Sequence, residues 1–128
     1  MMNLRLGYFP VFKGGDTVLL EGTSDGIRHL WARIKEFVAS SETELPIHSL
    51  SAVSTKHPAL LFVSRSAPKE GSGFRWLCSP KELNSIEGKL SALVASESGH
   101  QYFELAGSPA QLIVSVGEYG EKWWQNHG

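Results

Sequence analysis

This chain of 128 residues has one cysteine, a net charge close to zero and no long apolar run. Its one cysteine, Cys78, excludes an intrachain disulfide, so we expect a fold that an oxidising compartment did not shape. The formal net charge of -1 gives no basic field of the kind that attracts nucleic acid or an anionic membrane. No apolar run approaches the roughly 18 residues of a membrane-spanning helix, and the first residues do not resemble a secretory leader. We therefore expect a cytoplasmic protein with no nucleic-acid partner and no membrane.

The sequence motifs of catalysis and metal binding are also missing. The five histidines do not follow the spacing of known zinc sites. There is no Gly-x-Ser-x-Gly elbow, and no glycine-rich turn is followed by the Gly-Lys-Ser/Thr of a phosphate loop. Cys78 has no histidine near it in sequence, so we expect an inert buried thiol. These features predict a protein that is not an enzyme and that needs no metal or cofactor.

What the chain does contain is an internal likeness. Residues 18–40 and 74–96 align without a gap at an offset of 56, with apolar residues at matching positions. Two apolar runs further on, at 61–64 and 112–115, align at an offset of 51. The pattern predicts tandem β-α-β-β repeats over 17–65 and 73–116, followed by a C-terminal tail over 117–128. Duplication is one explanation, and chance likeness of two β-α-β-β units is the other.

Local signals for the two helices are strong. Apolar residues at helical spacing predict a helix over 25–39, with Thr23 or Ser24 as its N-cap. The run Ser79-Pro80-Lys81-Glu82 is a capping box with proline at the first helical position, and it predicts a helix that ends at about Ala95. We expect a single α+β domain over 1–128, with one antiparallel sheet of six or seven strands and both helices on one face.

Two histidines are candidate functional residues because of their places in the likeness. His48 opens the sequence His-Ser-Leu and His100 opens His-Gln-Tyr, which we align as the starts of corresponding strands. If a pseudo-twofold axis relates the two copies, the imidazoles could approach each other at a binding surface. The alternative is that each histidine is bonded to backbone and serves only the fold.

The tail is rich in aromatic residues, with Tyr119, Trp123 and Trp124 close together. Two adjacent tryptophans cannot both face one core, so one of them is expected at a rim or an interface. Because Trp and Tyr dominate interface hot spots, the tail is a candidate anchor for a protein partner. The alternative is that the tail packs over the sheet.

A different class of function follows if a pocket lies between the sheet and the helices. His100, Tyr102 and Glu104 would then supply its polar groups, and the protein would bind or convert a small molecule. A deep apolar pocket with converging polar groups favours this alternative. An exposed aromatic patch over a closed core favours protein binding.

Several short segments together resemble a known family. They are the turn Gly22-Thr23-Ser24-Asp25-Gly26-Ile27, the segment with His48, the strand end Val63-Ser64, and the sequences Gly99-His100-Gln101-Tyr102, Ile113-Val114-Ser115 and Glu118-Tyr119. In these segments the chain resembles the small α+β immunity proteins of bacterial polymorphic toxin systems, particularly the immunity protein 32 family. The resemblance implies a cytosolic protein that neutralises a cognate toxin by direct binding, and it assigns no catalytic residue.

Our leading interpretation is therefore a protein-binding module with a cognate toxin as its partner. A small-molecule-binding or enzymatic domain is the alternative, and a homodimer formed by pairing of exposed strands is a third interpretation. The candidate partner-binding residues are His48, His100, Tyr102, Glu104, Tyr119, Trp123 and Trp124.

Overall fold

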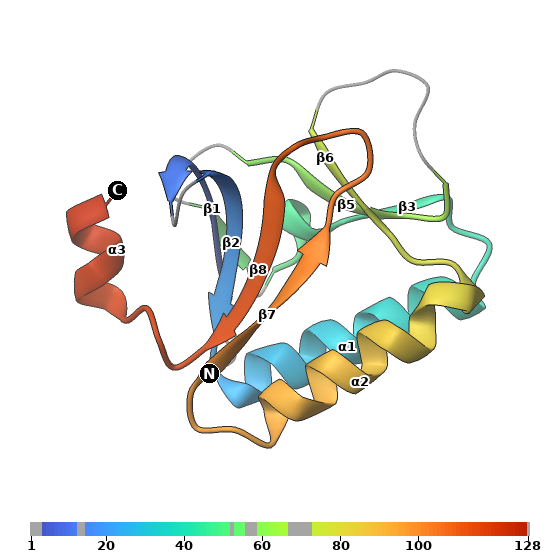
Figure 1. The fold of residues 1–128 in the computed structure, drawn as a ribbon. Helices are drawn as coiled ribbons and strands as arrows, with labels where there is room; N and C mark the ends of the chain where they lie inside the picture. Colours follow the sequence, from blue (N-terminus) through green and yellow to red (C-terminus); the bar gives the residue numbers. More distant parts are fainter. Residues whose placement is uncertain (1–3, 13–14, 52, 56–58, 67–72, 128) are drawn as a thin grey trace.

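The computed structural model describes residues 4–12, 15–51, 53–55, 59–66 and 73–127, and it has an α+β fold with three helices and two sheets (Figure 1). The α+β class predicted from the sequence is confirmed. In chain order the elements are β1 (Leu4–Phe12), β2 (Gly15–Gly22), α1 (Ser24–Ala39), β3 (Glu44–Pro46), the short 3-10 helix η1 (Ile47–Ser49), β4 (Val53–Thr55), β5 (Leu61–Ser64), β6 (Phe74–Leu77), α2 (Pro80–Val94), β7 (Gly99–Glu104), β8 (Gln111–Val116) and α3 (Glu121–His127).

The prediction of one antiparallel sheet is wrong. A five-stranded sheet has the order β4-β1-β2-β8-β7, a three-stranded sheet has the order β3-β5-β6, and both are mixed. Three pairs are parallel: β1 with β4, β2 with β8, and β5 with β6. The physical reason is that β2 and β6, the strands that open the two predicted repeats, each pair in parallel with a strand of the other repeat. Between β2 and β8 the chain includes α1 and α2, which supplies the long crossover that a parallel pair needs.

Each sheet therefore combines strands from both predicted repeats. We call residues 17–65 the first half and residues 73–116 the second half. In the five-stranded sheet, β2 of the first half lies beside β8, which pairs with β7, both from the second half. In the three-stranded sheet, β6 of the second half lies beside β5, which pairs with β3, both from the first half.

The strand registers follow the two sequence offsets. Val18 lies opposite Leu112 in one parallel pair. Its counterpart at the offset of 56, Phe74, lies opposite Leu61, the counterpart of Leu112 at the offset of 51. Duplication itself stays a prediction, but the two half-sheets obey one register rule.

The same rule changes how the histidines compare. Glu44 lies opposite Ser64 in β3 and β5, and His100 lies opposite Ser115 in β7 and β8. His100 therefore corresponds to Glu44 at the offset of 56, not to His48. The two histidines do not occupy equivalent positions, contrary to the alignment made from the sequence.

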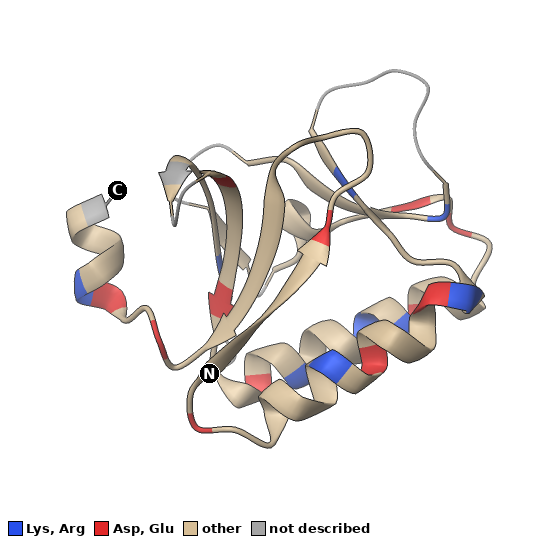
Figure 2. Ribbon diagram, in the orientation of Figure 1, with Lys and Arg blue, Asp and Glu red and all other residues tan. Residues whose placement is uncertain are grey.

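Helices α1 and α2 lie side by side against one face of the sheets (Figure 1). Thr23 caps α1 by accepting a hydrogen bond from Gly26 N at 3.0 Å. Ser79 and Glu82 form the predicted capping box of α2. Both helices carry acidic and basic residues (Figure 2), and the buried residues of their inner faces belong to one core shared by the two halves.

The third helix covers the other face of the five-stranded sheet. Trp124 of α3 is fully buried and packs with Phe9, Leu19 and Ile113 in a second apolar cluster. The helix comes close because Gly7 has no side chain: a Cβ there would lie 2.9 Å from the ring atoms of both Phe9 and Trp124. The prediction of two helices missed α3, because seven residues with paired tryptophans do not show a clear helical period.

None of the helices in the described part of the chain is both long and apolar enough to span a membrane.

Candidate functional site

The two halves differ at the edge of their first strand. In the first half, β1 lies between β2 and β4, antiparallel to β2 and parallel to β4. In the second half, the counterpart of β2 is β6, and the segment 104–106 lies across from β6 as β4 lies across from β2. These two segments meet directly at one bridge, in which Ala106 N donates to Arg75 O at 2.8 Å. Among the described strands, none takes the place of β1 beside β6.

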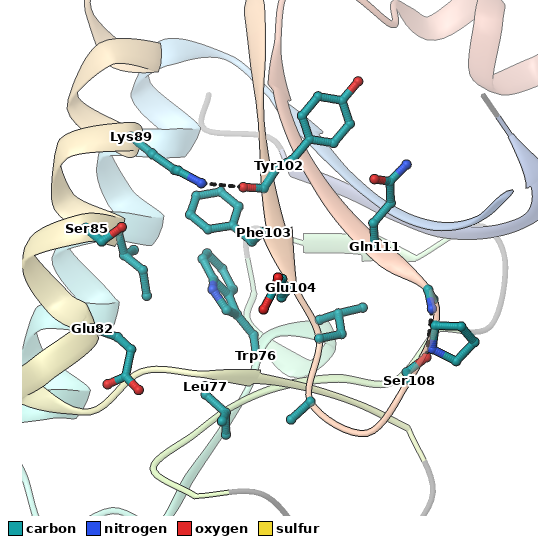
Figure 3. Close-up of a pocket in the computed structure, with 15 residues that line it drawn as sticks. Trp76, Leu77, Glu82, Ser85, Lys89, Tyr102, Phe103, Glu104, Ser108 and Gln111 are labelled. Carbon is teal, nitrogen blue, oxygen red and sulfur yellow. Dashed lines mark hydrogen bonds between the residues drawn. The ribbon is translucent and has the colours of Figure 1, made fainter. Parts of the chain in front are cut away.

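A groove opens next to this bridge, between β6, α2, β7 and the loop at 105–110. Its volume is about 830 Å³ (Figure 3). The rings of Trp76 and Phe103 pack together in its wall, with centroids 4.8 Å apart, and Ile86 and Leu105 extend the apolar surface. We call this space the β6–β7 groove.

Several polar groups of the β6–β7 groove already have partners within the fold. Lys89 Nζ donates to the carbonyl oxygen of Tyr102 at 2.7 Å and lies 4.9 Å from the centre of the Phe103 ring. Glu82 belongs to the α2 capping box, and Ser108 Oγ accepts a hydrogen bond from Ala110 N at 3.1 Å. The groove therefore offers mainly apolar surface and strand backbone to an incoming group.

The backbone of β6 faces the groove at Leu77. Phe74 N donates to Leu60 O at 2.7 Å, and Cys78 N donates to Ser64 O at 2.8 Å, so the amides of these residues point towards β5. In a parallel pair the amides of alternate residues point in opposite directions, which turns the N–H and C=O of Arg75 and Leu77 away from β5. The Arg75 carbonyl bonds to Ala106, and Leu77 lines the groove.

Two of the predicted site residues, Tyr102 and Glu104, belong to the groove wall. The Tyr102 ring points away from the groove, towards the sheet face opposite Phe103, and it is 43% exposed (Figure 3). His100 lies near the start of the same strand, with its ring edge-on to Tyr102 at 5.2 Å. A pocket between sheet and helices does exist, but its apolar wall is made by Trp76 and Phe103, which sequence reasoning missed.

His100 belongs instead to a polar row that crosses the five-stranded sheet. Arg5, Glu21, Ser115 and His100 lie opposite one another on successive strands. His100 Nδ1 lies 2.8 Å from Glu118 Oε1, and Ser115 Oγ donates to the same oxygen at 3.0 Å. Because the serine and the histidine both bind the carboxylate, this trio does not have the serine-to-histidine hydrogen bond of a nucleophilic triad.

Glu21 is the buried carboxyl of the row and lines a second cavity of about 430 Å³. Its Oε2 accepts hydrogen bonds from the backbone of Glu118 at 3.3 Å and of Tyr119 at 3.4 Å. Burial raises the pKa of Glu21 to about 7, although these two N–H groups and the charge of Arg5 act to lower it. Glu21 thereby ties the chain leading into α3 to β2.

His48 lies in η1 and is bonded to backbone. Leu61 N donates to His48 Nδ1 at 3.1 Å, and the ring packs edge-on against Phe62 at 4.9 Å. The histidine connects η1 to β5. This is the position expected for a histidine that is bonded to backbone and serves only the fold. The structure does not bring His48 to the β6–β7 groove or to His100.

The aromatic residues of the tail divide into buried and partly exposed positions. Trp124 is fully buried, and its Nε1 donates to Tyr119 O at 3.1 Å. Trp123 is half-buried at the rim and contacts the rings of Phe9, Phe12 and Tyr119. The tail packs over the sheet and leaves part of Trp123 at the surface.

A sequence signal for the groove existed. A strand-like segment at 4–12 precedes the first half, whereas a Ser-, Pro- and Gly-rich stretch at 66–73 precedes the second. This composition does not predict a strand at 66–73, and among the described strands none pairs with β6 on the side away from β5. Comparisons of the chain with protein-family models, with curated proteins and with solved structures found no match.

Proposed function

We propose that this protein is a protein-binding module and that the β6–β7 groove is its partner surface. The observation that carries the proposal is that the edge of β6 at Leu77 faces an apolar groove and has no strand partner among the described strands, whereas the counterpart of β6, β2, is covered by β1. An exposed strand edge with a groove beside it is a common docking place for another protein chain.

The resemblance to immunity proteins suggests the kind of partner. On that basis we propose a cognate bacterial toxin, bound and neutralised in the cytoplasm by occlusion of its active surface. The fold is compatible with such a role, because the groove is lined by α2, which packs against α1, and by no residue of the C-terminal helix. A rigid, apolar surface with a polar rim is the usual anatomy of a protein interface.

The test is growth rescue in cells that express the product of the neighbouring reading frame. We expect wild-type protein to restore growth and to co-purify with that product. Ser85→Arg places a long charged side chain at the exposed wall of the groove and should abolish both effects. Ser91→Arg is the matched control, because Ser91 is also exposed on α2 and lies outside the groove lining. Equal rescue by the two variants would remove the groove from the interface.

Small-molecule binding is the second candidate function. The volume of the groove falls within the range of about 300 to 1,000 Å³ that is usual for ligand pockets, and its wall is aromatic. Native mass spectrometry of the purified protein separates the two candidates. A bound small molecule that is lost in Ser85→Arg and retained in Ser91→Arg favours ligand binding, whereas a mass equal to that of the chain alone favours the protein-binding proposal.

A further inference from the structure

We propose that the partner contributes an extended segment that inserts between β6 and residues 104–106, antiparallel to β6, in the position that β1 holds beside β2. This inference rests on the proposed function and specifies how the partner is recognised. Its template lies within the molecule, since the first half shows how a strand fills this position.

In the first half, β1 lies between β2 and β4, and its side chains alternate between the two faces of the sheet. We call the space between two such segments, β2 and β4 here or β6 and residues 104–106 in the second half, the seam. Leu4 and Leu6 are fully buried on the helix side of the sheet, and Arg5 between them points to the other face. Leu6 lies opposite Leu20, and Arg5 lies opposite Glu21. The filled seam thus has an apolar, basic, apolar pattern.

The register rule transfers this pattern to the second half. At the offset of 56, Leu20 corresponds to Trp76 and Glu21 to Leu77. A residue inserted opposite Trp76 would point to the helix side, where Phe103 and Ile86 line the groove. An apolar side chain fits there.

The residue inserted opposite Leu77 would point to the other face of the sheet. The bridge between Arg75 and Ala106 runs antiparallel, so Leu77 and Glu104 lie across the seam from each other. Glu104 is exposed, and its neighbour on β7, Phe103, points to the opposite face, into the groove (Figure 3). A Lys or Arg at this place would meet the Glu104 carboxylate, while Lys89 is already bonded to the Tyr102 carbonyl. Charge complementarity therefore favours a basic residue flanked by apolar ones.

Insertion requires the seam to widen by about the 4.8 Å that separates neighbouring strands. A single hydrogen bond, from Ala106 N to Arg75 O, joins the two edges in the described part of the seam. An incoming strand replaces that bond with ladder bonds of its own and satisfies the outward-facing backbone of Leu77. A strand of the length of β6 would supply several such bonds.

The test uses a synthetic peptide with the sequence of residues 4–8, Leu-Arg-Leu-Gly-Tyr, blocked at both ends. Hydrogen exchange of the Leu77 amide in the full-length protein is measured by NMR with and without the peptide. We expect exchange at Leu77 to slow by about tenfold or more at saturation, as an amide does on entering a ladder. A backbone N-methylated peptide, which cannot donate those bonds, should have no effect.

Charge is tested in the same titration. Glu104→Lys should weaken peptide binding by about tenfold, whereas Glu87→Lys, on α2 and outside the groove lining, should leave it unchanged. The proposal is overturned if Leu77 exchange is unaffected, if the N-methylated peptide acts equally well, or if Leu77 is protected without peptide as protein concentration rises, which would indicate a second copy of the chain in the seam.

The outcome also separates this inference from the proposed function. If the toxin is neutralised but does not protect Leu77, the inserted strand is wrong and the protein-binding function stands. If the peptide protects Leu77 but growth is not rescued, the strand position stands and the proposed function fails.

Discussion

At Glu21 the fold holds a carboxyl group in a state that depends on pH near neutrality. The pKa of Glu21 is about 7 in the folded protein, against an ordinary value of 4.5. Its contribution to stability is therefore complete below pH 4.5 and is lost as the pH rises through 7. Burial of the charged form is the main cause.

Replacing this carboxyl by an amide should remove the pH dependence. Glu21→Gln keeps an oxygen that can accept from the Glu118 and Tyr119 N–H groups but carries no charge. We expect the variant to gain up to about 3 kcal/mol over wild type at about pH 8.5, with the gain shrinking towards pH 4.5. Urea unfolding across this range measures it. Glu97→Gln, at an exposed residue lining the same cavity, is the control, and a similar gain there would contradict the assignment to Glu21.

A second residue-scale prediction concerns the close approach of α3 to the sheet. In Gly7→Ala the new methyl group meets ring atoms of Phe9 and Trp124 at 2.9 Å, so we expect a loss of about 1 to 3 kcal/mol in unfolding free energy. Gly15→Ala is the strand control, because a Cβ there meets no atom of the described chain within 4 Å. Thermal unfolding that ranks the two variants in the opposite order would contradict the packing.

Among the elements, helices α1 and α2 could be predicted from the sequence, whereas α3 and the strand partners could not. Ser79 and Glu82 form the expected capping box, because its geometry depends only on neighbouring residues. By contrast, β2 pairs with β8, and nothing in residues 15–22 specifies a partner so far along the chain. The segment at His48, which the sequence comparison placed at the start of a strand, is instead the 3-10 helix η1 between β3 and β4, because the chain turns at Ile47 and His48 binds the backbone of β5.

The groove illustrates the same limit. Tyr102 and Glu104 were predicted as site residues from their segment alone, and both line the groove. Trp76 and Phe103 were not predicted as site residues, because their sequence pattern is that of ordinary core residues. Their place in the groove becomes clear only from the pairing of β6, which has no counterpart of β1 among the described strands. The functional interpretation of a strand edge depends on pairing, which is not local in sequence.

Element α3 should show unequal roles for its two tryptophans. Trp124 is fully buried against the sheet, so Trp124→Ala should lower the unfolding free energy by about 3 to 5 kcal/mol. Trp123→Ala removes a half-buried ring at the rim and should cost clearly less. Chemical denaturation of the two single variants measures the difference. Equal losses would show that α3 does not dock through Trp124.

For the whole molecule, the central point is that two similar halves are completed differently. In each sheet the first strand of one half, β2 or β6, lies beside two strands of the other half, and the two parallel pairs have matching registers. The first half is closed by β1, and the second is left with the β6–β7 groove. We therefore propose that the partner binds where, among the described strands, the second half has no counterpart of β1, and that the aromatic tail serves packing over the sheet.

The most direct test of this account is the affinity of the purified partner for two variants, measured by titration calorimetry. Ser85→Arg alters the groove, whereas Trp123→Ala alters the exposed part of the aromatic tail. The account predicts that Ser85→Arg weakens binding by about thirtyfold or more, the loss typical of an interface hot spot, and that Trp123→Ala changes it by less than about threefold. The reverse order would contradict the account and place the partner on the tail.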